Sequence, residues 1–210
     1  MSEKKTTTIV NTIVCLTILT FAMPAAQWFA GKFVTNPELR GTVSSVSIIL
    51  GVGLLIRKQK AIWLRAFSAQ WKMFYYLALT VVLGLLVFNI QDQPVAKMTG
   101  RARMPLEVFD LIVLLPVAEE LIFRGAIWSM LEKITSSYIS ILAGTSLLFG
   151  VEHLGYWTQT NWPLSPKAYL HVISMVFAGV FFGFFRFKSG SLTIPALLHM
   201  LANGAILLTQ

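Results

Sequence analysis

Charged residues are scarce in this chain. Aspartate, glutamate, lysine and arginine make up 12% of its 210 residues, whereas 56% are hydrophobic. A soluble domain of this length cannot bury so much apolar surface. A lipid bilayer makes burial unnecessary, because hydrocarbon solvates the outward faces of the helices. The composition therefore excludes an ordinary soluble domain and predicts an integral membrane protein.

Other features are absent or nearly so. The single cysteine, Cys15, excludes an intrachain disulfide and a cysteine-based zinc cluster. We find no repeat and no low-complexity tract. The net charge of +8 lies largely between apolar segments, as with Arg57 and Lys58, where anionic lipid headgroups would meet it. Because no basic stripe carries interleaved aromatic residues, we expect no nucleic-acid partner.

The long apolar runs predict an all-α bundle of about seven transmembrane helices. The first follows Lys4 and Lys5, and we expect it to stay uncleaved, because it is too long for a signal-peptide core and no good Ala-x-Ala site follows. The second is short, so Arg40 and Arg57 would have to snorkel to water. The predicted spans are Ile9–Ala30, Gly41–Ile56, Met73–Ile90, Leu106–Leu131, Tyr138–His153, Ala168–Phe185 and Leu192–Leu208.

Residues 61–71 lie between the second and third spans. They place Trp63, Phe67 and Trp71 four residues apart, which is one face of a helix lying on the headgroups. The alternative is a bend that extends the neighbouring spans.

The basic residues indicate an orientation. With the N-terminus in the cytoplasm, ten basic residues fall on the cytoplasmic side and six on the outer side, and seven spans leave the C-terminus outside. The ten are Lys4, Lys5, Arg57, Lys58, Lys60, Arg65, Lys72, Lys133, Arg186 and Lys188, and the six are Lys32, Arg40, Lys97, Arg101, Arg103 and Lys167.

Ionisable residues at mid-span gather in the second half of the chain. The polar connection over residues 91–105 separates plain N-terminal helices (1–103) from helices with polar side chains (104–210), within one integrated membrane domain. An ionisable side chain at mid-bilayer is costly and usually serves a function. The same half of the chain contains Glu152 at the end of the fifth span and His171 near the start of the sixth, and the sequence assigns neither a role.

The segment PVAEELIFRG, residues 116–125, holds two adjacent carboxylates. Glu120 and Arg124 are four residues apart and share a helix face, so they can pair. Glu119 is turned about 100° away and lacks that partner. We expect Pro116 to loosen the helix nearby. A purely structural ion pair explains Glu120 and Arg124 but leaves Glu119 unexplained.

Two further spans carry histidines at helical spacing. Phe149 and His153 share one face, as do His199 and Asn203. His199 and Asn203 both donate hydrogen bonds, which a developing oxyanion needs. Alternatively they are polar contacts between membrane helices, and His153 is an interfacial residue.

Together these motifs resemble a known family. EELIFRG is similar to an EExxxR motif, FGVEH to FxxxH and HMLAN to HxxxN, in that order. They are the signatures of the CAAX prenyl endopeptidase and bacteriocin-processing (CPBP) family, formerly the abortive-infection family. The resemblance covers about residues 104–208, and the small size resembles its bacterial branch.

The resemblance implies an intramembrane endopeptidase in a bacterial cell membrane that hydrolyses a membrane-embedded peptide or protein. It implies that Glu119 is the general base with His153 beside it, that His199 and Asn203 stabilise the oxyanion, and that Glu120 and Arg124 hold the site together. Bacterial members are linked to peptide maturation, bacteriocin self-immunity and regulation of membrane proteins.

Two questions stay open at the level of sequence. Glu119, His153 and His199 would make a plausible zinc site, but no HExxH motif is present. A site without cofactor gives every residue a role, and we favour it. A non-catalytic scaffold or immunity protein that binds a membrane partner is the alternative function. A transporter is disfavoured because we see no inverted repeat.

Overall fold

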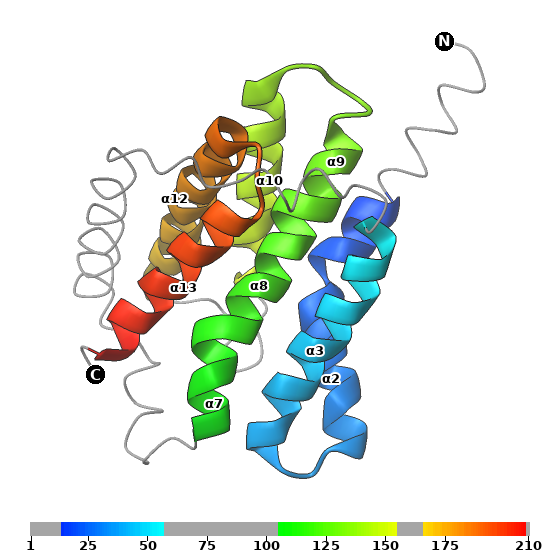
Figure 1. Ribbon diagram of the computed structural model, residues 1–210, viewed down its shortest axis with the longest axis vertical. Helices are drawn as coiled ribbons and strands as arrows, with labels where there is room; N and C mark the ends of the chain where they lie inside the picture. Colours follow the sequence, from blue (N-terminus) through cyan, green and yellow to red (C-terminus); the bar gives the residue numbers. More distant parts are fainter. Residues whose placement is uncertain (1–13, 57–104, 155–165, 209–210) are drawn as a thin grey trace.

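The computed structural model describes residues 14–56, 105–154 and 166–208, and this part of the chain consists of helices and short connections, without strands. Figure 1 shows the helices packed as one bundle. The expected third span and the helix at residues 61–71 lie outside the described residues. The helices are α2 (Ala22–Phe33), α3 (Pro37–Ile56), α7 (Pro105–Phe109), α8 (Leu115–Glu120), α9 (Trp128–Leu131), α10 (Tyr138–Glu152), α12 (Pro166–Ser189) and α13 (Thr193–Leu208).

The helix lengths and the exposed apolar side chains of the bundle fit a lipid bilayer. Ala168–Ser189 is long and apolar enough to cross a membrane, and three shorter apolar helices accompany it: Leu39–Leu54, Tyr138–Glu152 and Thr193–Leu207. Large apolar side chains such as Trp28, Ile139 and Phe177 are about 70% exposed (67%, 75% and 70%), which lipid tolerates and water does not. The described part of the chain is therefore a helical membrane bundle, as predicted.

The first expected span is bent. Val14–Thr20 and α2 meet at an angle of 55° and pass the length and hydropathy test for a span only as a pair. Pro24 explains the bend, because it has no N–H for the carbonyl of Thr20 and its ring crowds that carbonyl. The second helix is longer than expected: α3 begins at Pro37, so Arg40 lies inside it, with its Nε donating to the carbonyl of Val34 at 3.2 Å.

The helix expected at Leu106–Leu131 is continuous but not regular. Two π-helical segments, η1 (Asp110–Leu114) and η2 (Leu121–Ile127), interrupt it on either side of α8. The amide of Leu115 bonds the carbonyl of Asp110, five residues back. Pro116, which cannot donate, is the second residue of α8, two residues after η1 ends. Wide turns of this kind are rare and occur often at functional sites.

The helix ends alternate between the two ends of the bundle. In Figure 1 the α9–α10 and α12–α13 connections lie at one end, and the α2–α3 connection and the C-terminus lie at the other. A glycine shapes one connection: α12 ends at Ser189, and Gly190 follows with φ of 62°, a conformation that favours glycine.

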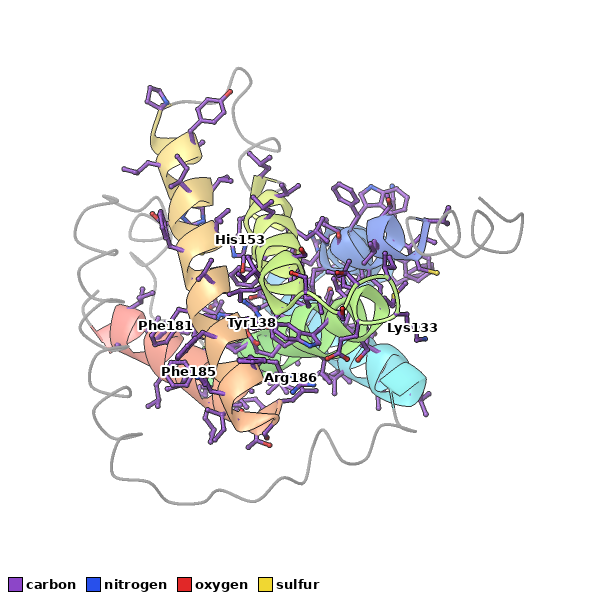
Figure 2. All side chains as sticks on the ribbon, turned by 90° about the horizontal axis from the view of Figure 1, so that it is seen from above. Lys133, Tyr138, His153, Phe181, Phe185 and Arg186 are labelled. Carbon is purple, nitrogen blue, oxygen red and sulfur yellow. The ribbon has the colours of Figure 1, made fainter. Side chains whose placement is uncertain are left out.

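The position of Arg186 differs from the one assigned to it when the basic residues of the loops were counted. The sequence places it in a cytoplasmic loop, but it lies within α12, is buried, and donates from Nε to the carbonyl of Arg124 at 3.2 Å. That carbonyl is available because the amide of Trp128, its partner in a regular α-helix, reaches Phe123 and Gly125 instead. Figure 2 shows Arg186 beside Tyr138 at this end of the bundle.

Candidate active site

Two glutamates occupy the end of α8, where the helix widens into η2. Glu119, Glu120 and Arg124 are all buried inside the bundle. Apolar side chains such as Ala118, Ile122 and Phe123 surround them in the main core. Charges held so deep in an apolar bundle must be compensated by partners.

Arg124 supplies that compensation for Glu120. Its Nη1 lies 3.0 Å from Glu120 Oε1, in the i,i+4 geometry that the spacing predicts. Its Nη2 donates to the carbonyl of Gly179 on α12 at 2.9 Å. The guanidinium carbon also lies 4.6 Å from the ring centre of Phe149 and 5.6 Å from that of Phe182. Arg124, which lies in η2, therefore connects Glu120 at the end of α8 with α10 and α12.

Gly179, whose carbonyl accepts from Arg124, also lies where α10 and α12 pack very closely. A Cβ atom at Gly179 would lie 2.9 Å from the Cα of Ser146, so only glycine fits there. Gly150, one turn further along α10, meets Val176 in the same way. Small residues that let backbones approach are typical of helix contacts in membranes.

His199 joins the two glutamates. Its Nδ1 lies 3.1 Å from Glu120 Oε1, and its Nε2 lies 3.6 Å from Glu119 Oε2. The ring is stacked on Phe182, with centroids 4.6 Å apart and planes at 18°. An imidazolium can satisfy both carboxylates, whereas a neutral ring that donates from Nδ1 presents a lone pair at Nε2. One side chain from α13 thus contacts both carboxylates of α8.

His153 stands at the end of α10. Its Nδ1 lies 2.8 Å from the carbonyl of Phe149, so a neutral ring carries its proton on Nδ1 and keeps Nε2 as an acceptor. Its ring is 4.9 Å from that of Phe149 and 5.6 Å from that of His171 on α12. Figure 2 shows His153 on the side of α10 that faces α12. Phe149 also contacts His199, with ring centroids 5.9 Å apart, and so lies between the two histidines.

Asn203 lies one turn beyond His199. Its Nδ2 donates to the carbonyl of Leu111 in η1 at 3.0 Å. An asparagine amide has two N–H groups, so this bond fixes its orientation and leaves one N–H for another acceptor.

Glu152 is a third buried carboxylate. No donor among the described residues reaches its Oε2. The sequence shows that a glutamate precedes His153, but it does not show which way that side chain turns. The sequence also did not predict that Gly179 and Phe182 belong to the site, because each takes part in it through a contact with another helix.

The alternative zinc ligands are not assembled into a metal site in this structure. Among the described residues, no three histidine, cysteine, aspartate or glutamate side chains converge where a metal could sit. Glu119 and His199 do face each other, but both ring nitrogens of His199 are directed at carboxylates. A metal at this position would have to displace one of those contacts.

The sequence of the second half of the chain matches that of a known protein family. The family model described as type II CAAX prenyl endopeptidase Rce1-like matches residues 102–205, which include all three motifs. No curated protein and no solved structure matches the chain.

Proposed function

Because this chain belongs to the Rce1-like family of type II CAAX prenyl endopeptidases, we propose that it hydrolyses a peptide bond of a membrane-embedded peptide or protein. The observation that supports this proposal is a pair of buried carboxylates joined by one histidine. Glu120 is compensated by Arg124 and His199, whereas Glu119 has a looser contact, 3.6 Å from His199. Glu119 is therefore the carboxylate available to water.

In the proposed reaction Glu119 acts as the general base. It takes a proton from water while the water oxygen attacks the carbonyl carbon of the scissile bond. We propose that His153, whose Nδ1 is held by the carbonyl of Phe149, acts with Glu119 to activate this water. When the tetrahedral intermediate collapses, Glu119 returns the proton to the departing amine.

His199 and Asn203 would stabilise the oxyanion. The mechanism requires that His199 is protonated at the start, so that an Nε2–H faces Glu119 Oε2, 3.6 Å away. Once Glu119 has taken the proton from water it is neutral, and the Nε2–H can turn to the new negative charge. Asn203 contributes the N–H that Leu111 does not use. The same step that creates the oxyanion thus releases a donor for it.

We propose that this chemistry needs no metal, because the carboxylate base and the two donors already cover the roles that hydrolysis requires. We further propose a bacterial cell membrane as its location and peptide maturation or bacteriocin self-immunity as its context. Prenylation of the substrate is not part of the proposal.

The test is hydrolysis by purified protein. The protein, reconstituted in vesicles, is incubated with the membrane peptides of its own producer, and the fragments are identified by mass spectrometry. Glu119→Gln keeps the shape of the side chain and removes the base, so fragments should form at least about a hundredfold more slowly. Equal hydrolysis by Glu119→Gln would overturn the assignment. A biological phenotype that survives in Glu119→Gln would instead favour the non-catalytic scaffold.

A further inference from the structure

Asp110 is a buried carboxylate that the proposed reaction does not use. It is the first residue of η1 and is 6% exposed. Both α7 and η1 pack against α3, as Figure 1 shows for α7. A Cβ atom at Gly41 of α3 would lie 2.7 Å from Asp110 Oδ2, so the carboxylate meets the backbone of α3 very closely.

Among the described residues, no basic side chain pairs with Asp110, and its buried Oδ1 has no donor. Arg40 is on the same helix as Gly41, but its side chain lies against Gly31 of α2. Glu107, one turn before Asp110, adds further negative charge. A charge buried in an apolar bundle requires a partner or a bound cation.

Two hydroxyl groups of α3 lie on the side that meets Asp110. Ser45 is 1% exposed, and its Oγ faces the Asp110 carboxylate but forms no hydrogen bond with any described residue. Thr42 is three residues earlier, on the same side of the helix, and its Oγ1 is also buried without a partner. By contrast, the hydroxyls of Ser44 and Ser47 donate to carbonyls one turn back. Three buried oxygen atoms without partners are thus grouped between α3 and η1.

The chemistry of these atoms indicates the ligand. Carboxylate and hydroxyl oxygens bind hard cations. The group contains one buried carboxylate, so a monovalent cation makes it neutral, whereas a divalent cation leaves a net charge in an apolar interior. Three protein oxygens in a close helix contact suit a small ion, because space and ligand number set selectivity. Backbone carbonyls at breaks in membrane helices also coordinate sodium, and the wide turn of η1 begins at Asp110.

We propose that Asp110, Ser45 and Thr42 bind a sodium ion between α3 and η1. The next residue of η1, Leu111, accepts from Asn203 of α13 through its carbonyl. A sodium ion that holds Asp110 against α3 therefore also fixes the segment that orients Asn203. The site connects α3 to the second half of the chain and does not depend on the proposed reaction.

The test measures the melting temperature of the full-length protein in detergent, in sodium, potassium or choline chloride at a constant ionic strength of about 0.15 M. Sodium should raise the melting temperature by about 5 °C or more relative to choline, as expected for an ion at roughly a hundred times its dissociation constant. Potassium should raise it clearly less. Equilibrium binding of radioactive sodium should saturate at one ion per chain.

Three variants locate the site. Asp110→Asn keeps the shape and removes the charge, so it should abolish both sodium binding and the sodium-dependent rise. Ser45→Ala removes one ligand and should raise the sodium concentration needed for half of the rise about tenfold or more. Ser47→Ala is the matched control, because Ser47 is an exposed serine of the same helix whose hydroxyl bonds the carbonyl of Val43 at 2.7 Å. It should respond to sodium as the wild type does.

Equal melting temperatures of the wild type in sodium and in choline would overturn the site, since Asp110 would then be neutralised by a proton. A sodium-dependent rise that survives in Asp110→Asn would also overturn it, because the ion would bind elsewhere. An equal rise in potassium would overturn the choice of sodium. None of these measurements uses peptide hydrolysis, so failure of the sodium site leaves the proposed function standing.

Discussion

His199 and Glu120 are joined across two helices by a contact of 3.1 Å between Nδ1 and Oε1. The same carboxylate oxygen also accepts from Arg124 at 3.0 Å. Glu120 therefore does more than neutralise a buried arginine, because it also directs a histidine whose other nitrogen faces Glu119. Loss of Glu120 should therefore lower both stability and turnover, whereas loss of Glu119 should lower turnover alone.

Removing either partner of the buried pair should destabilise the protein. Glu120→Leu or Arg124→Met leaves one charge in an apolar interior, which costs about 3–5 kcal/mol by analogy with buried pairs in soluble proteins. Both variants should melt earlier in detergent and reach lower levels in the membrane. The double variant should recover part of the loss, because neither charge is then stranded. Glu120→Leu should also lower turnover per folded molecule, because His199 loses the partner that orients it.

The matched control is Glu119→Leu. It should melt close to the wild type, or somewhat later, because active sites hold groups that folding would discard. Its turnover should be nearly abolished. If Glu119→Leu melts early while Glu120→Leu melts normally and is inactive, the roles of the two glutamates are exchanged.

Asn203→Leu tests the amide that bonds Leu111. Loss of that hydrogen bond should cost about 1 kcal/mol, seen as a modest fall in melting temperature. Turnover per folded molecule should fall about a hundredfold or more, as expected for an oxyanion donor. Asn203→Asp, which keeps the shape but has no N–H in its ionised form, should lose turnover to a similar degree. Full turnover alongside a lower melting temperature would make Asn203 only a link between α13 and η1.

Metal dependence can be measured directly. We expect purified, active protein to contain no stoichiometric zinc and to remain active in o-phenanthroline, because both nitrogens of His199 are directed at carboxylates. Elemental analysis and a chelation series check this. One tightly bound zinc per chain, with activity that only zinc restores after stripping, would reverse the proposal.

Reporter fusions test the orientation. A reporter after Gln210 should be external and one near Lys60 cytoplasmic. The corrected position of Arg186 reduces the cytoplasmic count from ten to nine, against six outside, so the expected side does not change. Two reporters on the same side would contradict the seven-span arrangement.

The sequence predicted the described helices well, because each apolar run is long and bounded by polar or turn-forming residues. Tyr138–His153 was expected and Tyr138–Glu152 is observed, and Leu192–Leu208 was expected and Thr193–Leu208 is observed. The Glu120–Arg124 contact also followed from spacing alone, since both residues lie on the same helix.

Features that depend on two helices were not predictable from a single sequence. Spacing cannot show that His199 bridges both glutamates, because the relative rotation of α8 and α13 is set by packing. The stacking of His199 on Phe182 and the close approach at Gly179 have the same origin. The π-helical segments were missed because the loosening expected at Pro116 does not specify which hydrogen bonds re-form.

The second π-helical segment also sets the register of everything that follows it. A π-turn accommodates an extra residue relative to an α-helix, and one residue corresponds to a rotation of about 100°. If the same seven residues, Leu121–Ile127, formed a regular α-helix instead, Trp128 would turn away from Arg186, whose guanidinium now lies 5.7 Å from the Trp128 ring centre. A sequence that aligns to this segment with a one-residue gap can therefore present the same inward-facing side chains on both sides of the gap, because the gap removes the residue that the wide turn accommodates.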